Sequence, residues 1–346
     1  MNIQASDLIY LMNQWAPEEL AESWDHPGLQ VGNPGQSVKK VLISLDLTEE
    51  NVSYAIAHGV DMVISHHPFL FKPIHRLDLT SYKGHIIEQL IKKDILAFAA
   101  HTNLDTAEEG VNDALADALG LVDKEGLVPE KKYALLKVSI HTVRSKAEAF
   151  QQLLEREYKE MAGPCSFFCE SSGKEGTLEF TVDERAVSHV LSDLERIKGV
   201  AHYEVWELVN GGRQEFMGRI GNLPKPLVGE EALLYIKKKL GIPNLRYVGN
   251  SHILVKRIAV LGGAGSEFAA LAKARGADLY LTGDLKYHEA QDIAAQGLLV
   301  VDGGHFYTER VIVLKLAERI RREAAKRGWD LEVLEDSKAE DIFKNL

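Results

Sequence analysis

The chain has 346 residues, of which 45% are hydrophobic and 26% charged, so it is long enough for two or three globular domains. Its formal net charge of −11 disfavours a general nucleic-acid binder, because such proteins attract phosphates with a positive field. It contains neither a run of 18 apolar residues nor a basic, apolar leader, which argues against a membrane protein and predicts a cytoplasmic location.

Residues 1–126 alternate between predicted helices and strands. We expect Ser6 to cap a first helix in the segment 2–23, a second short helix at 17–23, and residues 22–35, which are rich in Pro and Gly, to form a loop. The elements that follow are strands at 38–47, 61–65 and 95–100 and helices at 48–59, 82–93 and 111–119. This alternation of strand and helix predicts a parallel, mostly buried sheet.

The pattern changes at residues 127–132, a polar stretch with Pro129 that we expect to be a linker. The residues after it predict the order strand, helix, strand, strand, helix, strand, which is typical of a ferredoxin-like domain. The strands are expected at 134–140, 166–169, 178–182 and 203–209, and the helices at 145–158 and 184–197. We therefore predict an inserted domain at 127–215 between the two parts, 1–126 and 216–346, of an α/β domain.

The predicted insert holds the two cysteines of the chain, Cys165 and Cys169. They are four residues apart, and a zinc ribbon would need a second such pair. Free thiols in a reducing compartment are therefore favoured over a metal site.

The α/β pattern resumes from about Phe216. We expect strands at 256–261, 278–282 and 298–302 and helices at 229–240, 266–275, 287–295 and 308–327. The last residues, 335–346, predict a weakly structured tail with at most one helical turn.

The two α/β parts resemble each other in sequence. The segment that begins KVLISLDL aligns with the one that begins KRIAVLGG, so that Asp61 falls on Asp278 and His67 on Asp284. Downstream, HTNLD and HFYTE share the spacing His-x-x-x-carboxylate. A single duplication explains this better than a repeat array, which would recur more often. It predicts two βαβ-type halves related by rough two-fold symmetry, with strand ends that enclose a cleft.

The segment DMVISHHPFLF shows how a strand end could carry chemistry. Its apolar run predicts a buried strand that stops at Pro68, which has no N–H to donate, so that His66 and His67 come at the carboxyl end. Ligands bind at that end of an open α/β sheet. Taken alone, the pair has two interpretations: both imidazoles bind one metal site, or one caps the strand while the other is solvated.

Further candidate ligands in the sequence favour a metal site over a capped strand end. Five residues with ligand side chains fall at predicted strand ends or helix starts: His66, His67, Asp105, His305 and Glu309. His305 and Glu309 are four apart, so a helix that begins at Gly304 would place them on one face. Imidazole and carboxylate ligands suit zinc, iron, manganese, cobalt or nickel. Five ligands exceed the three of a catalytic zinc, which favours two metal ions bridged by a carboxylate.

Other polar residues cluster in the same places. We expect Asp25 to be a turn residue, Asp46 and Asp284 to be helix caps, and His101 and His288 to support the metal ligands or carry protons. Residues 262–265, GGAG, follow a strand and precede a helix, and either cradle a phosphate or form a tight turn.

The segments ESWDHPGLQVG, LDLT, SHHPFLF, HTNLD, GGAG, TGDLKYH and DGGHFYTE resemble, in order, the signature segments of the Nif-three-like family. Its members are also labelled type-two homologs of GTP cyclohydrolase I, and the resemblance covers about 1–125 and 217–335. It implies a duplicated α/β fold and a dinuclear centre held by the same five residues, His66, His67, Asp105, His305 and Glu309. It also implies a toroidal homohexamer, a trimer of dimers, and an inserted domain similar to the PII and CutA proteins.

For function, the resemblance implies a metal-dependent hydrolase with two divalent ions per subunit that acts on a nucleotide or a related heterocycle. The chain shows no nucleotide-binding motif of its own, and a fold does not determine a substrate. The alternative is a non-catalytic, metal-handling or regulatory protein that forms a hexameric ring. Binding to nucleic acid is disfavoured by the net charge of −11.

Overall fold

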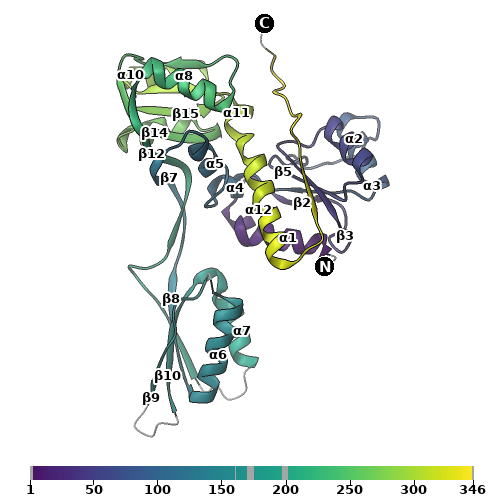
Figure 1. Cartoon of the computed structure of the whole chain (residues 1–346), viewed down its shortest axis with the longest axis vertical. Helices are drawn as coiled ribbons and strands as arrows, with labels where there is room; N and C mark the ends of the chain where they lie inside the picture. The colour runs from purple at the N-terminus through teal and green to yellow at the C-terminus, as the bar shows by residue number, and fades with distance from the viewer. Residues whose placement is uncertain (1–2, 160, 170–174, 197–201, 345–346) are drawn as a thin grey trace. The chain divides into compact units, whose positions relative to one another are not determined.

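The computed structural model describes residues 3–159, 161–169, 175–196 and 202–344 (Figure 1). Contacts divide the chain into two compact units, which we call the α/β unit (Met1–Pro129 with Phe216–Leu346) and the inserted unit (Glu130–Glu215). Across the part of the chain that is described, no helix has both the length and the apolar character needed to cross a bilayer.

The first sheet of the α/β unit has five strands in the order β17-β4-β5-β6-β2. All neighbours are parallel except the last pair, β6 and β2. A separate two-stranded antiparallel sheet joins β1 (Ile3–Gln4) to β3 (Ser37–Val38). The other elements of this half are α1 (Ala5–Trp15), η1 (Glu18–Leu20), β2 (Gly28–Val31), β4 (Lys40–Ser44), α2 (Glu49–His58), β5 (Met62–Ser65), α3 (Tyr82–Lys92), β6 (Leu96–Ala99) and β17 (Glu332–Glu335).

The second sheet has six strands in the order β13-β16-β15-β14-β12-β7. Its centre, β14-β15-β16, is parallel, whereas β13 and β12 run antiparallel to their neighbours β16 and β14. The elements of this half are β7 (Val122–Tyr133), β12 (Arg213–Val228), α8 (Gly229–Leu240), β13 (Arg246–Val248), β14 (Leu254–Ala264), η2 (Ser266–Phe268), α9 (Ala269–Ala274), β15 (Leu279–Gly283), α10 (Tyr287–Ala295) and β16 (Leu299–Asp302).

The last helix of each half packs against the sheet of the other half. Helix α5 (Val111–Ala118) follows the first half in sequence, yet Leu115 packs in one core cluster with Val260 and Leu281 of the second sheet. Helix α12 (Val311–Arg327), yellow in Figure 1, packs instead against β4, β17 and α5. The short helices α4 (Thr102–Thr106) and α11 (His305–Glu309) directly precede α5 and α12, so both lie at the junction of the halves.

The two halves also repeat one backbone device. Asp61 Oδ2 accepts hydrogen bonds of 2.8 and 2.9 Å from two consecutive backbone N–H groups at the start of β4. Asp278 Oδ2 accepts bonds of 2.9 and 2.8 Å from the equivalent N–H groups of β14. The helix before each aspartate is followed by a left-handed glycine, Gly59 or Gly276. The alignment of these residues in the sequence therefore has a structural counterpart.

Several elements differ from the sequence-based expectation at sheet edges. The expected linker at 127–132 belongs to β7, which tolerates Pro129 because an edge strand leaves one row of N–H groups unpaired. The expected loop at 22–35 contains the edge strand β2, and the sequence also failed to predict the edge strand β17 and the inner strand β12. Edge strands have a neighbour on one side only and are often short or polar, so their apolar pattern is weak.

Helix ends show smaller corrections. Gln4, not Ser6, is the N-cap of α1, and the short helix expected after it is the single 3₁₀ turn η1. Thr48 and Gly59 cap α2 as predicted. The long helix expected at 308–327 is two helices, α11 and α12, which meet at Arg310. Residues 336–344 form no helical turn.

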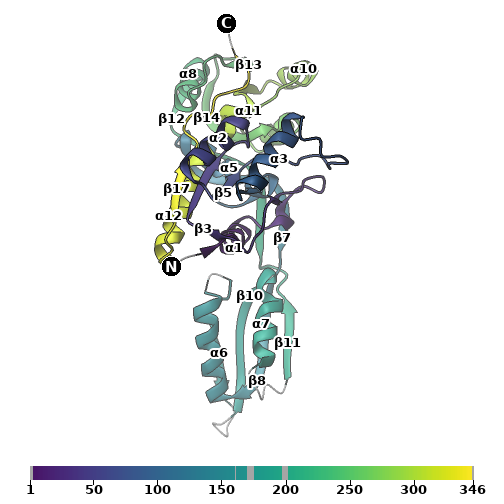
Figure 2. The same cartoon turned by 90° about the vertical axis from the view of Figure 1, so that its right-hand side faces the viewer.

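The inserted unit is built on an antiparallel sheet of order β11-β8-β10-β9. Both of its helices lie against the same face of that sheet (Figures 1 and 2). Alternate residues such as Val138, Ile140 and Phe180 point into a core that the helices close with Phe150 and Val190. Its elements are β8 (Leu135–Val143), α6 (Arg144–Glu157), β9 (Ser166–Cys169), β10 (Glu175–Asp183), α7 (Glu184–Arg196) and β11 (His202–Glu207). Ile197, the expected end of the second helix, lies outside the described residues.

Candidate metal centre

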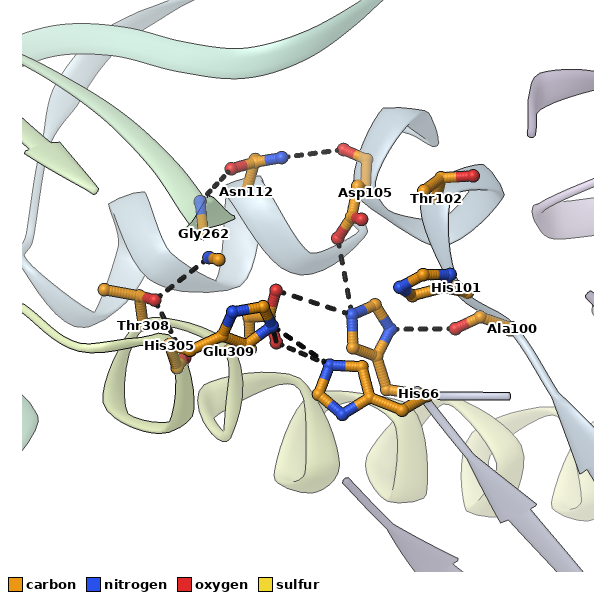
Figure 3. Close-up of polar contacts among 12 residues, drawn as sticks. His66, Ala100, His101, Thr102, Asp105, Asn112, Gly262, His305, Thr308 and Glu309 are labelled. Carbon is orange, nitrogen blue, oxygen red and sulfur yellow. Dashed lines mark hydrogen bonds and ion pairs between the residues drawn. The ribbon is translucent and has the colours of Figure 1, made fainter. Parts of the chain in front are cut away.

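The five residues predicted as metal ligands meet at the junction of the two halves. Figure 3 labels His66, Asp105, His305 and Glu309 among them. His66 and His67 follow β5, Asp105 lies in α4, and His305 and Glu309 begin and end α11. Together they offer three imidazoles and two carboxylates from segments more than 200 residues apart.

Glu309 stands at the centre of this group. Its side chain is only 4% exposed, and its two oxygens face different neighbours. Oε2 lies 2.8 Å from His67 Nε2 and 3.1 Å from His305 Nε2. Oε1 lies 3.9 Å from His66 Nε2, which in turn lies 3.6 Å from Asp105 Oδ1. The carboxylate therefore divides the cluster into a His66–Asp105 side and a His67–His305 side.

Each imidazole is held by a partner on its other ring nitrogen. His66 Nδ1 lies 2.8 Å from the backbone carbonyl oxygen of Ala100. His67 and His305 pair through Nδ1 with carboxylates, Asp46 at 2.7 Å and Asp284 at 2.8 Å, and the neighbouring His101 pairs in the same way with Asp25 at 2.9 Å. Metal-binding histidines have this arrangement, because the outer acceptor orients the ring and turns Nε2 towards the ion.

His101 belongs to the same cluster, whereas His288 does not. Ligand atoms of His66, His67 and His101 all lie within 4.8 Å of one another. Asp25 holds His101 and also accepts a hydrogen bond of 2.6 Å from the Thr102 hydroxyl. His288 is exposed in the first turn of α10 and lies in none of the potential metal-binding groups among the described residues.

Two buried polar atoms of the cluster lack a hydrogen-bond partner. They are His66 Nε2 and Asp105 Oδ1, which face each other at 3.6 Å, beyond hydrogen-bond length. An unsatisfied buried polar atom costs free energy, and a bound ion would satisfy both atoms at once. The donor set of this cluster therefore fits a divalent metal.

The pKa values show how much charge the cluster concentrates. Burial, reinforced by the charge of Glu309, raises the pKa of Asp105 to about 8. Burial lowers the pKa of His67, but the bonds to Asp46 and Glu309 outweigh it and raise that pKa to about 10. The pKa of His305 is raised in the same way, to about 9, because the bonds to Glu309 and Asp284 outweigh burial. The imidazoles around Glu309 outweigh its burial and hold its pKa well below the usual value. Without metal, protons therefore occupy ligand positions at neutral pH.

A buried amide on α5 joins the ligand-bearing helix α4 to the second sheet. Asn112, 1% exposed, donates from Nδ2 to the Asp105 carbonyl oxygen at 2.9 Å. Its Oδ1 accepts a 2.9 Å hydrogen bond from the backbone N–H of Gly262 (Figure 3). A Cβ on the neighbouring Gly263 would lie 2.2 Å from Glu309 Oε1, so only glycine leaves room for the carboxylate.

This arrangement decides between the two interpretations of the GGAG segment. The backbone N–H groups of Gly262, Gly263 and Gly265 donate to side chains of the protein, namely Asn112, Thr308 and Thr282. They are therefore not free to bind a phosphate. The segment is the end of β14, where the register shifts between Val260 and Ala264 before η2 begins at Ser266; it accommodates Glu309 and is not a phosphate cradle.

Two carboxylates have roles other than those expected, and Asp25, which lies at the expected turn, has a further role. Asp46 and Asp284 are not helix caps, since Thr48 and Lys286 occupy the N-cap positions of α2 and α10. Asp25 does accept a local turn bond from the His26 backbone N–H, but it also holds His101. A carboxylate at a strand end is equally compatible with a cap and with a histidine partner, so residue type alone could not separate the two roles.

Comparison with known proteins identifies the family of the chain. The family description Duf34/NIF3 (NGG1p interacting factor 3) matches residues 3–341. The chain belongs to this family. A relative from Halalkalibacterium halodurans, named GTP cyclohydrolase 1 type 2 homolog, is 32% identical, with 97% of each chain covered. The relative of the same name from Bacillus subtilis is 32% identical over 90% of each chain. The crystal structure of a Bacillus cereus protein related to NIF3 is 31% identical and superimposes with a TM-score of 0.90, covering 99% of both chains.

Proposed function

We propose that this NIF3-family protein is a metal-dependent hydrolase whose cluster would hold two divalent metal ions, with Glu309 contributing to both sets of ligands. One ion would be held by His66, Asp105 and Glu309, and the other by His67, His305 and Glu309. The observation that carries the proposal is the pair of unsatisfied buried atoms, His66 Nε2 and Asp105 Oδ1, beside a carboxylate with one oxygen towards each set.

Divalent ions bound there would supply Lewis-acid activation of water and of a carbonyl, ring-carbon or phosphoryl electrophile. The residues of the chain supply orientation and proton transfer. Asp46 and Asp284 hold the rings of His67 and His305. His101, fixed by Asp25 beside His66 and His67, can carry a proton at Nε2 between the site and solvent.

For a substrate we propose a nucleotide or a related heterocycle, which the names of the curated relatives support. Metal analysis by mass spectrometry, with a hydrolysis screen of metal-loaded protein on GTP, other nucleotides and a metabolite extract, tests both parts. The His66→Ala variant is the control, because it removes one ligand of the His66–Asp105 side. Two bound ions and turnover that this variant loses would support the proposal, whereas full metal occupancy in the variant would remove His66 from the site.

A second candidate function is metal handling without catalysis. It is favoured by the exposure of the His67–His305 side, where the two side chains are 22% and 39% exposed, in contrast to 0% for His66. An exposed ion can exchange with solvent or with a partner protein. Transfer of one ion to a chelator in seconds, together with no turnover in the screen, would favour this function over hydrolysis.

We also propose that the chain is cytoplasmic and forms a homohexameric ring, and that the inserted unit is a ferredoxin-like domain of the PII/CutA type. The insert is supported by its element order and by the strand order β11-β8-β10-β9. The ring is supported by the sequence resemblance, and the location by the two free cysteines, Cys165 and Cys169. Light scattering of the purified protein tests the ring, since a monomer or dimer would contradict it.

A further inference from the structure

Two aromatic rings lie on the solvent side of the candidate metal centre. Trp24, which precedes β2, is 54% exposed, and Phe71, which follows the His66–His67 segment, is 44% exposed. Their ring centroids are 5.8 Å apart with an interplanar angle of 66°, which is an edge-to-face pair. The two rings pack on each other yet keep much of their surface in water. We call them the aromatic rim.

The aromatic rim contacts the metal centre through His101. The centroid of the His101 ring lies 6.1 Å from that of Trp24 and 6.1 Å from that of Phe71, edge-on in both cases. On its other side, the His101 ring lies 5.4 Å from His66 and 5.6 Å from His67. A continuous series of rings therefore leads from solvent to the imidazoles at the centre.

From this arrangement we infer that the aromatic rim is a stacking surface for a fused heteroaromatic ring of the substrate. The inference rests on the proposed metal-dependent function and names the chemical class that the site accepts. Planar rings gain from stacking on, or edge contact with, Trp and Phe, whereas a sugar or an aliphatic chain offers no such face. Recognition through a π-face also needs no nucleotide motif in the sequence.

The ring series also indicates the size of the ligand. Two ring-to-ring steps separate Trp24 from His66 and His67, with His101 between them. A ligand that stacks on the rim and reacts at the histidines must reach past His101, so it extends beyond the stacked ring, and the reacting atom would lie on that ring or on a group attached to it.

Calorimetric titration with two probes tests the inference. Guanosine 5′-monophosphate carries a fused ring, and ribose 5-phosphate carries the same sugar phosphate without it. Both are titrated into the full-length wild type, Trp24→Ala and Phe71→Ala, each with and without added metal. The matched control is Trp206→Ala, which removes a tryptophan of similar exposure, 46%, from the inserted unit. We expect each rim variant to bind the nucleotide about tenfold more weakly and the ribose phosphate unchanged, with no effect in the control.

Equal nucleotide affinity in wild type and both rim variants would overturn the inference, as would a wild type that does not bind the nucleotide. A smaller assembly of Trp24→Ala in light scattering, with unchanged nucleotide affinity, would also overturn it and assign the rim to a subunit contact. Metal content is measured separately by mass spectrometry. A protein that takes up no metal even when metal is added, yet still shows the ring-dependent difference, would refute the proposed metal-dependent function and leave the inference about the rim standing.

Discussion

The two halves of the α/β unit share a scaffold but carry different chemistry at matching positions. Both anchor a strand start with an aspartate, Asp61 in one half and Asp278 in the other. At the strand end, however, the first half has His67 where the second has Asp284. The first half therefore supplies an imidazole to the centre, and the second supplies the carboxylate that orients another imidazole, that of His305.

The short helices at the junction differ in the same way. Asp105 of α4 and Glu309 of α11 occupy equivalent places in the spacing His-x-x-x-carboxylate. Glu309 is one methylene longer and reaches both His67 and His305, whereas Asp105 Oδ1 faces only His66. Position 263 of β14, beside Glu309, is glycine because a Cβ there would collide with the Glu309 carboxylate. One long and one short carboxylate thus convert two similar halves into a single shared site.

The largest effect that we expect comes from Glu309, the residue that breaks the symmetry. Glu309→Gln removes the charge that faces both sets of ligands, so metal affinity should fall by more than about 100-fold for both ions. Glu309→Asp keeps the charge but shortens the reach, and we expect it to retain one ion. Metal analysis after gel filtration measures the stoichiometry, with Glu230→Gln on the surface of α8 as the control. Two ions in Glu309→Gln would contradict the bridging role.

Metal binding should strengthen as pH rises, because protons and metal compete for the same atoms. Without metal, His67, His305 and Asp105 have pKa values of about 10, 9 and 8, so all three are mainly protonated at pH 7. Each must lose its proton to bind an ion, so affinity should rise by about tenfold per pH unit for each proton displaced. Calorimetry at pH 7 in buffers of different ionisation enthalpy counts the released protons. Binding without proton release would contradict the assignment of these ligands.

The outer carboxylates allow a direct test of equivalence between the halves. Asp46 and Asp284 are 51% and 52% exposed and lie 2.7 and 2.8 Å from Nδ1 of His67 and His305. We expect Asp46→Asn and Asp284→Asn each to weaken the His67–His305 ion by about 10-fold to 100-fold, because the ring loses its charged acceptor. Competition with a fluorescent chelator measures this. A large effect of one variant and none of the other would show that the two imidazoles are held differently.

The central fold was predictable because its strands carry their own signal. The strands β4, β5 and β15 have continuous apolar runs, and the stop of α2 at Gly59 follows from the left-handed conformation that glycine tolerates. Strands β2, β7, β12 and β17 were not predictable in this way. Their pairing comes from distant segments, as when β17 joins β4 from the other end of the chain. The packing of α5 and α12 against the sheet of the other half likewise depends on contacts between distant segments, so the sequence of either helix alone does not indicate it.

For the site, the candidate metal ligands could be predicted from the sequence, but the residues that orient them and hold their helices could not. His66, His67 and His305 directly follow strands, where an imidazole near a carboxylate indicates metal. Asp25 and Asn112 carry no such signal, since their roles depend on residues 76 and 150 positions away. For His101 a signal existed, because it occupies the place of His305 in the shared His-x-x-x-carboxylate spacing.

The smallest effect that we expect concerns the feature that the halves have in common, an aspartate that accepts hydrogen bonds from two consecutive backbone N–H groups. Asp61→Asn and Asp278→Asn each weaken a pair of charge-assisted bonds to backbone N–H groups, and each aspartate precedes its strand, β5 or β15, whereas the site residues His66 and Asp284 follow these strands. Each should lower the free energy of unfolding by about 1–2 kcal/mol and leave the metal content unchanged. The bonds share no partner, so the double variant should lose about the sum. Urea denaturation at fixed metal concentration measures all three variants. A loss confined to one half would mean that the repeated aspartates are equivalent in geometry but not in energy, and would restrict the symmetry of the halves to the backbone.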